Sequence, residues 1–104
     1  MKVIGVCACP AGIAHTYMAA ENLERAAKKR GYEVKIETDG SAGVENKLTE
    51  EDIQSADYII VAADTNVETE RFRGKKVLEA SVTDAIRNVK KIFDAIENDE
   101  VDIY

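Results

Sequence analysis

The chain has 104 residues, 45% of them hydrophobic and 33% charged, which fits one folded domain with its own core rather than a disordered segment. The 14 lysines and arginines against 20 aspartates and glutamates give a net charge of -6, which disfavours nonspecific binding to nucleic acid or to an anionic membrane surface. The longest apolar run, at 58–63, is far too short to span a bilayer, and no signal-peptide pattern fits the N-terminus.

The first thirty residues predict a strand followed by a helix. Residues 3–6 form a short apolar run rich in β-branched side chains, which is typical of a strand buried on both faces. Residues 13–30 have helical spacing, with basic side chains in the last turn where they complement the helix dipole. Gly31 is a natural residue to end that helix.

The next segment predicts a half-exposed strand and a short helix. Residues 32–38 alternate between apolar and charged side chains, which indicates an edge strand with one face in water. That wet face is expected to carry Glu33, Lys35 and Glu37. After a loop, residues 49–55 read as a helix in which Thr49 and Asp52 form a capping box.

The second half begins with another fully apolar run at 58–63, which predicts a second buried parallel strand. Residues 67–73 hold a helical turn. Residues 75–78 form a short, half-polar strand, which again indicates an edge of the sheet.

The clearest helical stripe of the chain runs over 82–96, with Ser81 as its cap and Asp84 in the capping-box position. The acidic residues that follow indicate a tail or the start of a linker. We therefore expect one domain at 1–97 and an acidic tail at 98–104.

Strands and helices alternate along the whole chain, which predicts an α/β three-layer sandwich with helices on both faces. The two apolar strands belong in the centre of the sheet, so right-handed crossovers give a four-stranded parallel sheet of order 2-1-3-4. That order has a switch point between the first and third strands, where ligands bind at the carboxyl ends. The loop at 7–16 follows the first strand.

Cys9 in this loop is the candidate nucleophile. It sits between the end of a strand and the start of a helix, where the helix dipole and unpaired amides lower the pKa of a thiol. The same amides bind phosphate oxygens, whereas Pro10 has none of its own. The predicted phosphate-binding loop consists of Pro10, Ala11, Gly12, Ile13, Ala14, His15 and Thr16.

Several other readings of these residues are weaker. Cys7 lies within or beside the strand and is read as a core residue, and His15 is equally compatible with a structural role and with donating to a phosphate. No metal is expected, because a fourth ligand is missing and the spacing fits no zinc pattern. Asp64 and Asp39 read as solvated turn formers, and the chain lacks both the receiver-type acidic cluster and the dinucleotide fingerprint.

Three segments resemble one known family: ACPAGIAHTYMAAE at 8–21, ETDGSAG at 37–43 and LTEEDI at 48–53. Together they resemble the fructose-type (fructose/mannose) enzyme IIB domain of the bacterial phosphoenolpyruvate-dependent sugar phosphotransferase system. That family usually has Thr at the positions of Cys7 and Ala11.

The resemblance implies that Cys9 accepts a phosphoryl group from a phosphohistidine of enzyme IIA and passes it to a hexose, fructose or mannose, bound by the membrane enzyme IIC. It implies a protein-phosphocysteine sugar phosphotransferase that needs no cofactor and works in the cytoplasm at the inner face of the membrane. Two alternatives stay open: a cysteine-dependent phosphatase, although no arginine closes the loop, and a redox or anion-binding module that uses both thiols.

Overall fold

The computed structural model describes residues 1–9, 13–40, 43–65, 67 and 69–103. The elements in chain order are β1 (Lys2–Ala8), α1 (Ile13–Lys29), β2 (Glu33–Gly40), β3 (Gly43–Glu45), α2 (Glu50–Ser55), β4 (Tyr58–Ala63), the single 3-10 turn η1 (Glu70–Phe72), β5 (Val77–Ala80), α3 (Val82–Arg87) and α4 (Val89–Glu97). No helix within this described part is long and apolar enough to cross a membrane.

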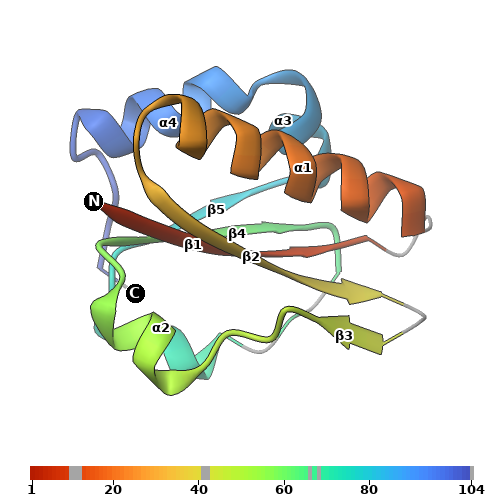
Figure 1. Cartoon of the computed structure of the whole chain (residues 1–104), viewed down its shortest axis with the longest axis horizontal. Helices are drawn as coiled ribbons and strands as arrows, with labels where there is room; N and C mark the ends of the chain where they lie inside the picture. Colours follow the sequence, from red (N-terminus) through yellow and green to blue (C-terminus); the bar gives the residue numbers. More distant parts are fainter. Residues whose placement is uncertain (10–12, 41–42, 66, 68, 104) are drawn as a thin grey trace.

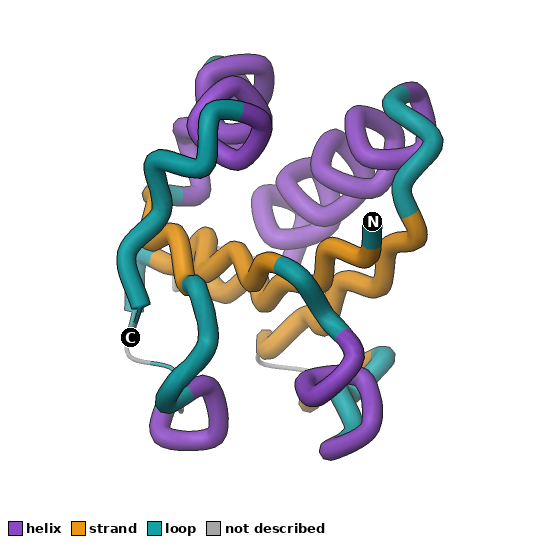
Figure 2. The backbone as a smooth tube through the Cα atoms, turned by 90° about the vertical axis from the view of Figure 1, so that its left-hand side faces the viewer, coloured by secondary structure: helices purple, strands orange, loops and turns teal. Residues whose placement is uncertain are grey.

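The elements form three layers, as expected for the α/β class. Helices α1, α3 and α4 cover one face of the sheet, and α2 with η1 covers the other (Figures 1 and 2). Each face has its own apolar core. The larger core packs Leu23 of α1 and Phe93 of α4 against the sheet, and the smaller one packs Ile53 of α2 and Phe72 of η1.

The sheet is a five-stranded mixed sheet of order β3-β2-β1-β4-β5, so the predicted four-stranded parallel sheet was wrong in strand number and in being all parallel. The four parallel strands β2-β1-β4-β5 do follow the predicted order. The missed strand, β3, pairs antiparallel with the end of β2. Its three residues are all exposed, so no hydrophobic pattern marks it in the sequence.

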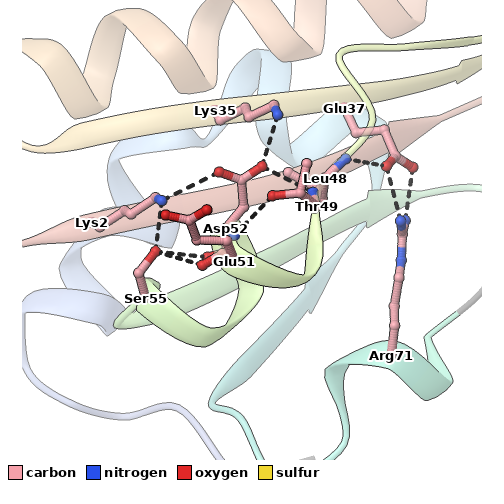
Figure 3. A network of polar contacts seen from close by, with 9 residues as sticks. All are labelled: Lys2, Lys35, Glu37, Leu48, Thr49, Glu51, Asp52, Ser55 and Arg71. Carbon is pink, nitrogen blue, oxygen red and sulfur yellow. Dashed lines mark hydrogen bonds and ion pairs between the residues drawn. The ribbon is translucent and has the colours of Figure 1, made fainter.

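The prediction for the charged face of β2 was also wrong at Glu37, which is 1% exposed. Its carboxylate accepts two hydrogen bonds from the Arg71 guanidinium, at 3.0 and 2.7 Å, and one from the Leu48 amide at 2.8 Å (Figure 3). The backbone at Leu48 and the turn η1 lie over this face, which the local sequence pattern does not reveal. The buried charge is tolerated because every contact to it is a charge-assisted hydrogen bond.

Asp52 organises the other end of the same polar network. Its carboxylate contacts Lys35 Nζ at 2.7 Å and Lys2 Nζ at 3.4 Å, and it accepts from the Thr49 amide at 2.9 Å (Figure 3). The hydrogen bond from Lys35 does most to lower the pKa of this carboxyl below its usual range. The predicted capping box of Thr49 and Asp52 is therefore confirmed, with two lysines added by β1 and β2.

The last helical stripe forms two helices instead of one. The Ser81–Asp84 capping box is confirmed at the start of α3, but the backbone of Asn88 leaves the helical region at φ -127° and ψ 34°. Beyond α4, the segment expected as an acidic tail runs back to β5. There Ile103 pairs with Lys76, and the Val77 amide donates to the Asp102 carbonyl at 3.1 Å.

The Glu37–Arg71 pair generates a stability prediction. We expect Arg71→Met to lower the free energy of unfolding by about 3 kcal/mol, because it leaves the carboxylate of Glu37 buried without its main counter-ion. Urea denaturation measures the change. Arg73→Met is the matched control, since the Arg73 side chain is 75% exposed and its ion pair at 3.4 Å is with Glu70, which is exposed as well. Its cost should stay below about 1 kcal/mol, and equal costs for the two variants would contradict the prediction.

Candidate functional site

The site lies where β1 and β4 end side by side. The two parallel strands pair in register up to Ala8 and Ala63, so the next residues of each, Cys9 and Asp64, continue at the same level. The Asp64 amide donates to the Ala8 carbonyl at 3.0 Å and so extends the ladder by one bond. From here β1 crosses to β2 on one side and β4 crosses to β5 on the other, which confirms the predicted switch point.

Cys9 belongs to the larger of the two cores and lies at this switch point. Its residue surface is 9% exposed, and its Sγ lies 4.0 Å from Asp64 Oδ2. The other carboxylate oxygen of Asp64 accepts a hydrogen bond from the Val82 amide, the first residue of α3, at 3.1 Å. The thiol therefore has a carboxylate neighbour that is held in place from a second element.

Sequence reasoning missed this role of Asp64. The residue is exposed, as expected of a turn former, but both of its carboxylate oxygens are engaged. The predicted strand order carried part of the signal, namely that Asp64 and Cys9 are neighbours, but not the contact between their side chains. Two neighbouring parallel strands place the residues that follow them next to each other, and here those residues are Cys9 and Asp64.

The first turn of α1 provides the positive side of the site. The amides of Ile13, Ala14 and His15 point along the helix axis without helical partners, as the first amides of any α-helix do. No acidic side chain occupies this turn, in contrast to the capping boxes of α2 and α3. The N-terminus of α1, which follows Cys9 in the chain, thus carries no acidic side chain that would compete with a bound anion.

Thr16 adds a polar group to this turn. The residue is 2% exposed, and its hydroxyl has no hydrogen-bond partner among the residues that the structure describes. A buried hydroxyl without a partner is costly, so its presence in the first turn favours a ligand that completes it. Ala14 and His15 are exposed beside it. The predicted site residues Pro10, Ala11 and Gly12 lie outside the described residues.

Cys7 differs from Cys9 in its surroundings. It is fully buried within β1, and burial, with smaller contributions from the charges of Asp39 and Glu24, raises the pKa of its thiol to about 12. A thiol with this pKa stays protonated at neutral pH and is a poor nucleophile. The prediction that Cys7 is a packing residue is therefore confirmed.

Two acidic residues, Glu37 and Asp39, lie near the carboxyl end of β2, where Asp39 pairs in register with Ala8. Burial and a hydrogen bond to Glu37 raise the pKa of Asp39 to about 6. Burial also works to raise the pKa of Glu37, but the bonds from Arg71, Asp39 and Leu48 outweigh it and leave that pKa below its ordinary value. Asp39 is thus not the solvated turn former that was expected, and of the two carboxyl groups it is the one that binds a proton at the higher pH.

The site shows no sign of a metal centre: within the ranges described, no three His, Cys, Asp or Glu side chains gather closely enough to hold an ion. A cavity of about 560 Å³ lies on the β4–β5 side and is lined by Ala63, Thr65, Glu79, Ser81 and Asp84 among others. Cys9 is not part of its wall.

Comparison with known proteins gives a consistent result. A family model described as "PTS system, Lactose/Cellobiose specific IIB subunit" matches residues 4–95. The chain is 52% identical over 97 residues to the "PTS system fructose-like EIIB component 2" of Escherichia coli strain K12, and the match covers 92% of both chains. The family model and the relative thus agree on the IIB type and differ in the sugar that they name.

Two longer proteins contain the same unit. The chain is 50% identical over 103 residues to the "PTS system fructose-specific EIIABC component" of Bacillus subtilis, where the match covers 99% of this chain but only 16% of the relative. A crystal structure of a domain from the fructose-specific IIABC component of Borrelia burgdorferi has a TM-score of 0.93 and 44% identity, covering 99% of this chain and 97% of that one.

The raised pKa of Asp39 generates a prediction about stability and pH. Its pKa is higher in the folded chain, about 6, than the ordinary value of 3.8. As the pH rises between these values, the unfolded chain therefore loses its proton first, and the free energy of unfolding falls. Asp39→Asn keeps a donor to Glu37 and has no proton to lose.

We expect Asp39→Asn to raise the free energy of unfolding at neutral pH by on the order of 1–3 kcal/mol and to leave it little changed near pH 3. Urea denaturation over a pH series measures both effects. Asp94→Asn, on the exposed side of α4, controls for the loss of one negative charge. A variant that is less stable than the wild type at neutral pH would contradict the raised pKa.

Proposed function

Because the chain belongs to the IIB family of the PTS system, in its fructose-type branch, we propose that Cys9 carries the phosphoryl group of a sugar phosphotransfer reaction. Cys9 accepts the group from a phosphohistidine of a IIA partner and passes it to a hexose bound by a membrane IIC partner. The observation that carries the proposal is the place of this thiol, between the end of a central strand and the open N-terminus of α1.

The first turn of α1 suits a phosphate on Cys9. Its amides donate hydrogen bonds, its dipole favours negative charge, and the hydroxyl of Thr16 is buried with no partner among the residues that the structure describes. His15 is exposed in the same turn, where it can donate either to the phosphate or to the incoming partner. Phosphoryl transfer needs mainly positioning and charge stabilisation, and this turn supplies both.

The absence of lysine and arginine from residues 10–16 favours a carrier over a phosphatase. A loop that holds phosphate by amides and hydroxyls stabilises the covalent intermediate without an arginine to drive its hydrolysis. A redox module is disfavoured because Cys7, the second thiol that it requires, is fully buried and has a pKa of about 12.

Fructose or a similar hexose is the sugar we propose, since the relatives described above carry fructose in their names at 50 and 52% identity. The name of the Bacillus subtilis relative combines IIA, IIB and IIC in one protein. We therefore propose IIA and IIC as the two partners, and the cytoplasmic face of the membrane as the place where they meet. No cofactor enters the proposed reaction.

The assignment of Cys9 is tested by a matched pair of variants. We expect Cys9→Ala to abolish transfer from a histidine-phosphorylated fructose-type IIA domain, because it removes the nucleophile. Cys7→Ala removes the same group from a buried position and should keep most of the transfer, at a stability cost of about 1 kcal/mol. Transfer of labelled phosphate from the IIA domain measures both.

The reverse pattern, with transfer lost in Cys7→Ala and kept in Cys9→Ala, would show that the acceptor is misassigned. Steady hydrolysis of an aryl phosphate by the wild-type chain alone would favour the phosphatase instead. A carrier should release at most about one equivalent of product in that assay.

Thr16 generates a prediction in which activity falls while stability does not. Valine has nearly the same shape as threonine but lacks the hydroxyl, so Thr16→Val should slow phosphoryl transfer about tenfold. The free energy of unfolding should stay constant or rise by about 1 kcal/mol, because a buried group without a partner is removed. Transfer rates and urea denaturation measure the two effects. Thr16→Ser, which keeps the hydroxyl, should transfer faster than Thr16→Val, and full transfer by the valine variant would exclude the hydroxyl from the site.

A further inference from the structure

The carboxylate of Asp64 is the charged group that the structure places at the thiol of Cys9, and the proposed function does not use it. Asp64 Oδ2 lies 4.0 Å from Cys9 Sγ. Its backbone amide bonds the Ala8 carbonyl at 3.0 Å, and Oδ1 accepts from the Val82 amide at 3.1 Å. The backbone and one oxygen are thus fixed by β1 and α3, and the second oxygen faces the sulfur.

A carboxylate that stays ionised at this position is unfavourable for holding a phosphate on Cys9. Phosphorylation of Cys9 would place nearly two negative charges beside it, and like charges at this separation repel. The arrangement becomes favourable if the carboxylate is neutralised at the moment that the phosphate arrives. The only proton that the reaction itself releases at this place is the proton of the thiol.

We propose that Asp64 stores the proton of the Cys9 thiol during phosphoryl transfer, an inference that rests on the proposed function. When the sulfur attacks phosphorus, the S–P bond forms and the N–P bond of the phosphohistidine breaks. The electron pair of that bond stays on the imidazole, which leaves as a neutral ring when its other nitrogen carries a proton. The S–H proton moves to Asp64 Oδ2, and the neutral carboxyl then donates a hydrogen bond toward the new phosphate.

The second transfer reverses the proton movement. The hydroxyl oxygen of the sugar attacks phosphorus, the O–P bond forms, the S–P bond breaks, and its electron pair returns to sulfur. Asp64 gives its proton to the departing thiolate and becomes a carboxylate again. The hydroxyl proton of the sugar is released to a base on the IIC side or to water, so the chain ends the cycle as it began, with Cys9 as a thiol.

A purely electrostatic role for Asp64 makes the opposite prediction, which allows a sharp test. A carboxylate near a thiol disfavours the thiolate. If Asp64 acted only through its charge, removing that charge would speed every reaction of Cys9. If Asp64 accepts the thiol proton, removing it speeds reactions that start from free thiolate but slows acceptance of phosphate.

Asp64→Asn is the informative variant, because the asparagine carbonyl can still accept from the Val82 amide while the charge and the proton acceptor are lost. Two rates are measured at one near-neutral pH. The first is acceptance of phosphate from a histidine-phosphorylated fructose-type IIA domain. The second is alkylation of Cys9 by iodoacetamide, an uncharged reagent. Mass spectrometry locates the modified cysteine, so that any modification of the buried Cys7 is not counted.

We expect Asp64→Asn to accept phosphate about a hundredfold more slowly than the wild type, while alkylation is unchanged or up to about tenfold faster. Asp64→Glu, which restores a carboxylate, should recover part of the transfer rate. Asp94→Asn, which removes one charge far along the chain on α4, should leave both rates within about twofold of the wild type.

Equal or faster phosphate acceptance by Asp64→Asn would overturn the proposal, and so would a fall in both rates together, which would indicate damage to the site. Failure of the wild-type chain to accept phosphate would overturn the proposed function and this proposal with it. If the wild-type chain and the Asp64→Asn chain accept phosphate equally well, this proposal alone is overturned and the proposed function stands.

Discussion

The parallel pairing of β1 with β4 is the constraint on which the site depends. Both strands are buried on both faces, so their register is held by the close packing of their side chains against the elements that cover each face. The same register brings Cys9 and Asp64 to one level at the switch point. A slip of one residue would move Cys9 to the opposite face of the sheet and exchange it with Ala8. Core packing and site geometry are therefore fixed by the same contacts.

The two cysteines show how the position of a residue relative to a strand end sets the surroundings of its thiol. Cys7 lies inside the ladder, paired with Thr38 on one side and Ala62 on the other, and burial raises its pKa to about 12. Cys9 lies just beyond the paired residues, where the chain turns toward α1 and the carboxylate of Asp64 comes close. Two thiols with one residue between them thus have different surroundings, because only one of them has reached the end of the sheet.

The face of the sheet that α2 and η1 cover is held by ion pairs as well as by apolar contacts. Glu37 is buried on this face and joins η1 to β2 through Arg71, and Asp52 joins α2 to the two lysines of β1 and β2 (Figure 3). These bonds tie down short segments that bury only a small core around Phe72. The acid pair of Glu37 and Asp39 brings this network to the carboxyl end of β2, beside Ala8.

The sequence by itself determined the order of the four parallel strands, both capping boxes and the contrast between Cys7 and Cys9. These features depend on hydrophobic period, on residues three apart, or on the position of a residue relative to a strand end, all of which are local. Only the tertiary structure decided the exposed strand β3, the burial of Glu37 against Arg71 and the approach of Asp64 to the thiol. Each of these depends on a partner that lies on another strand or 34 to 55 residues away along the chain, and no local pattern records which distant side chain will balance a charge.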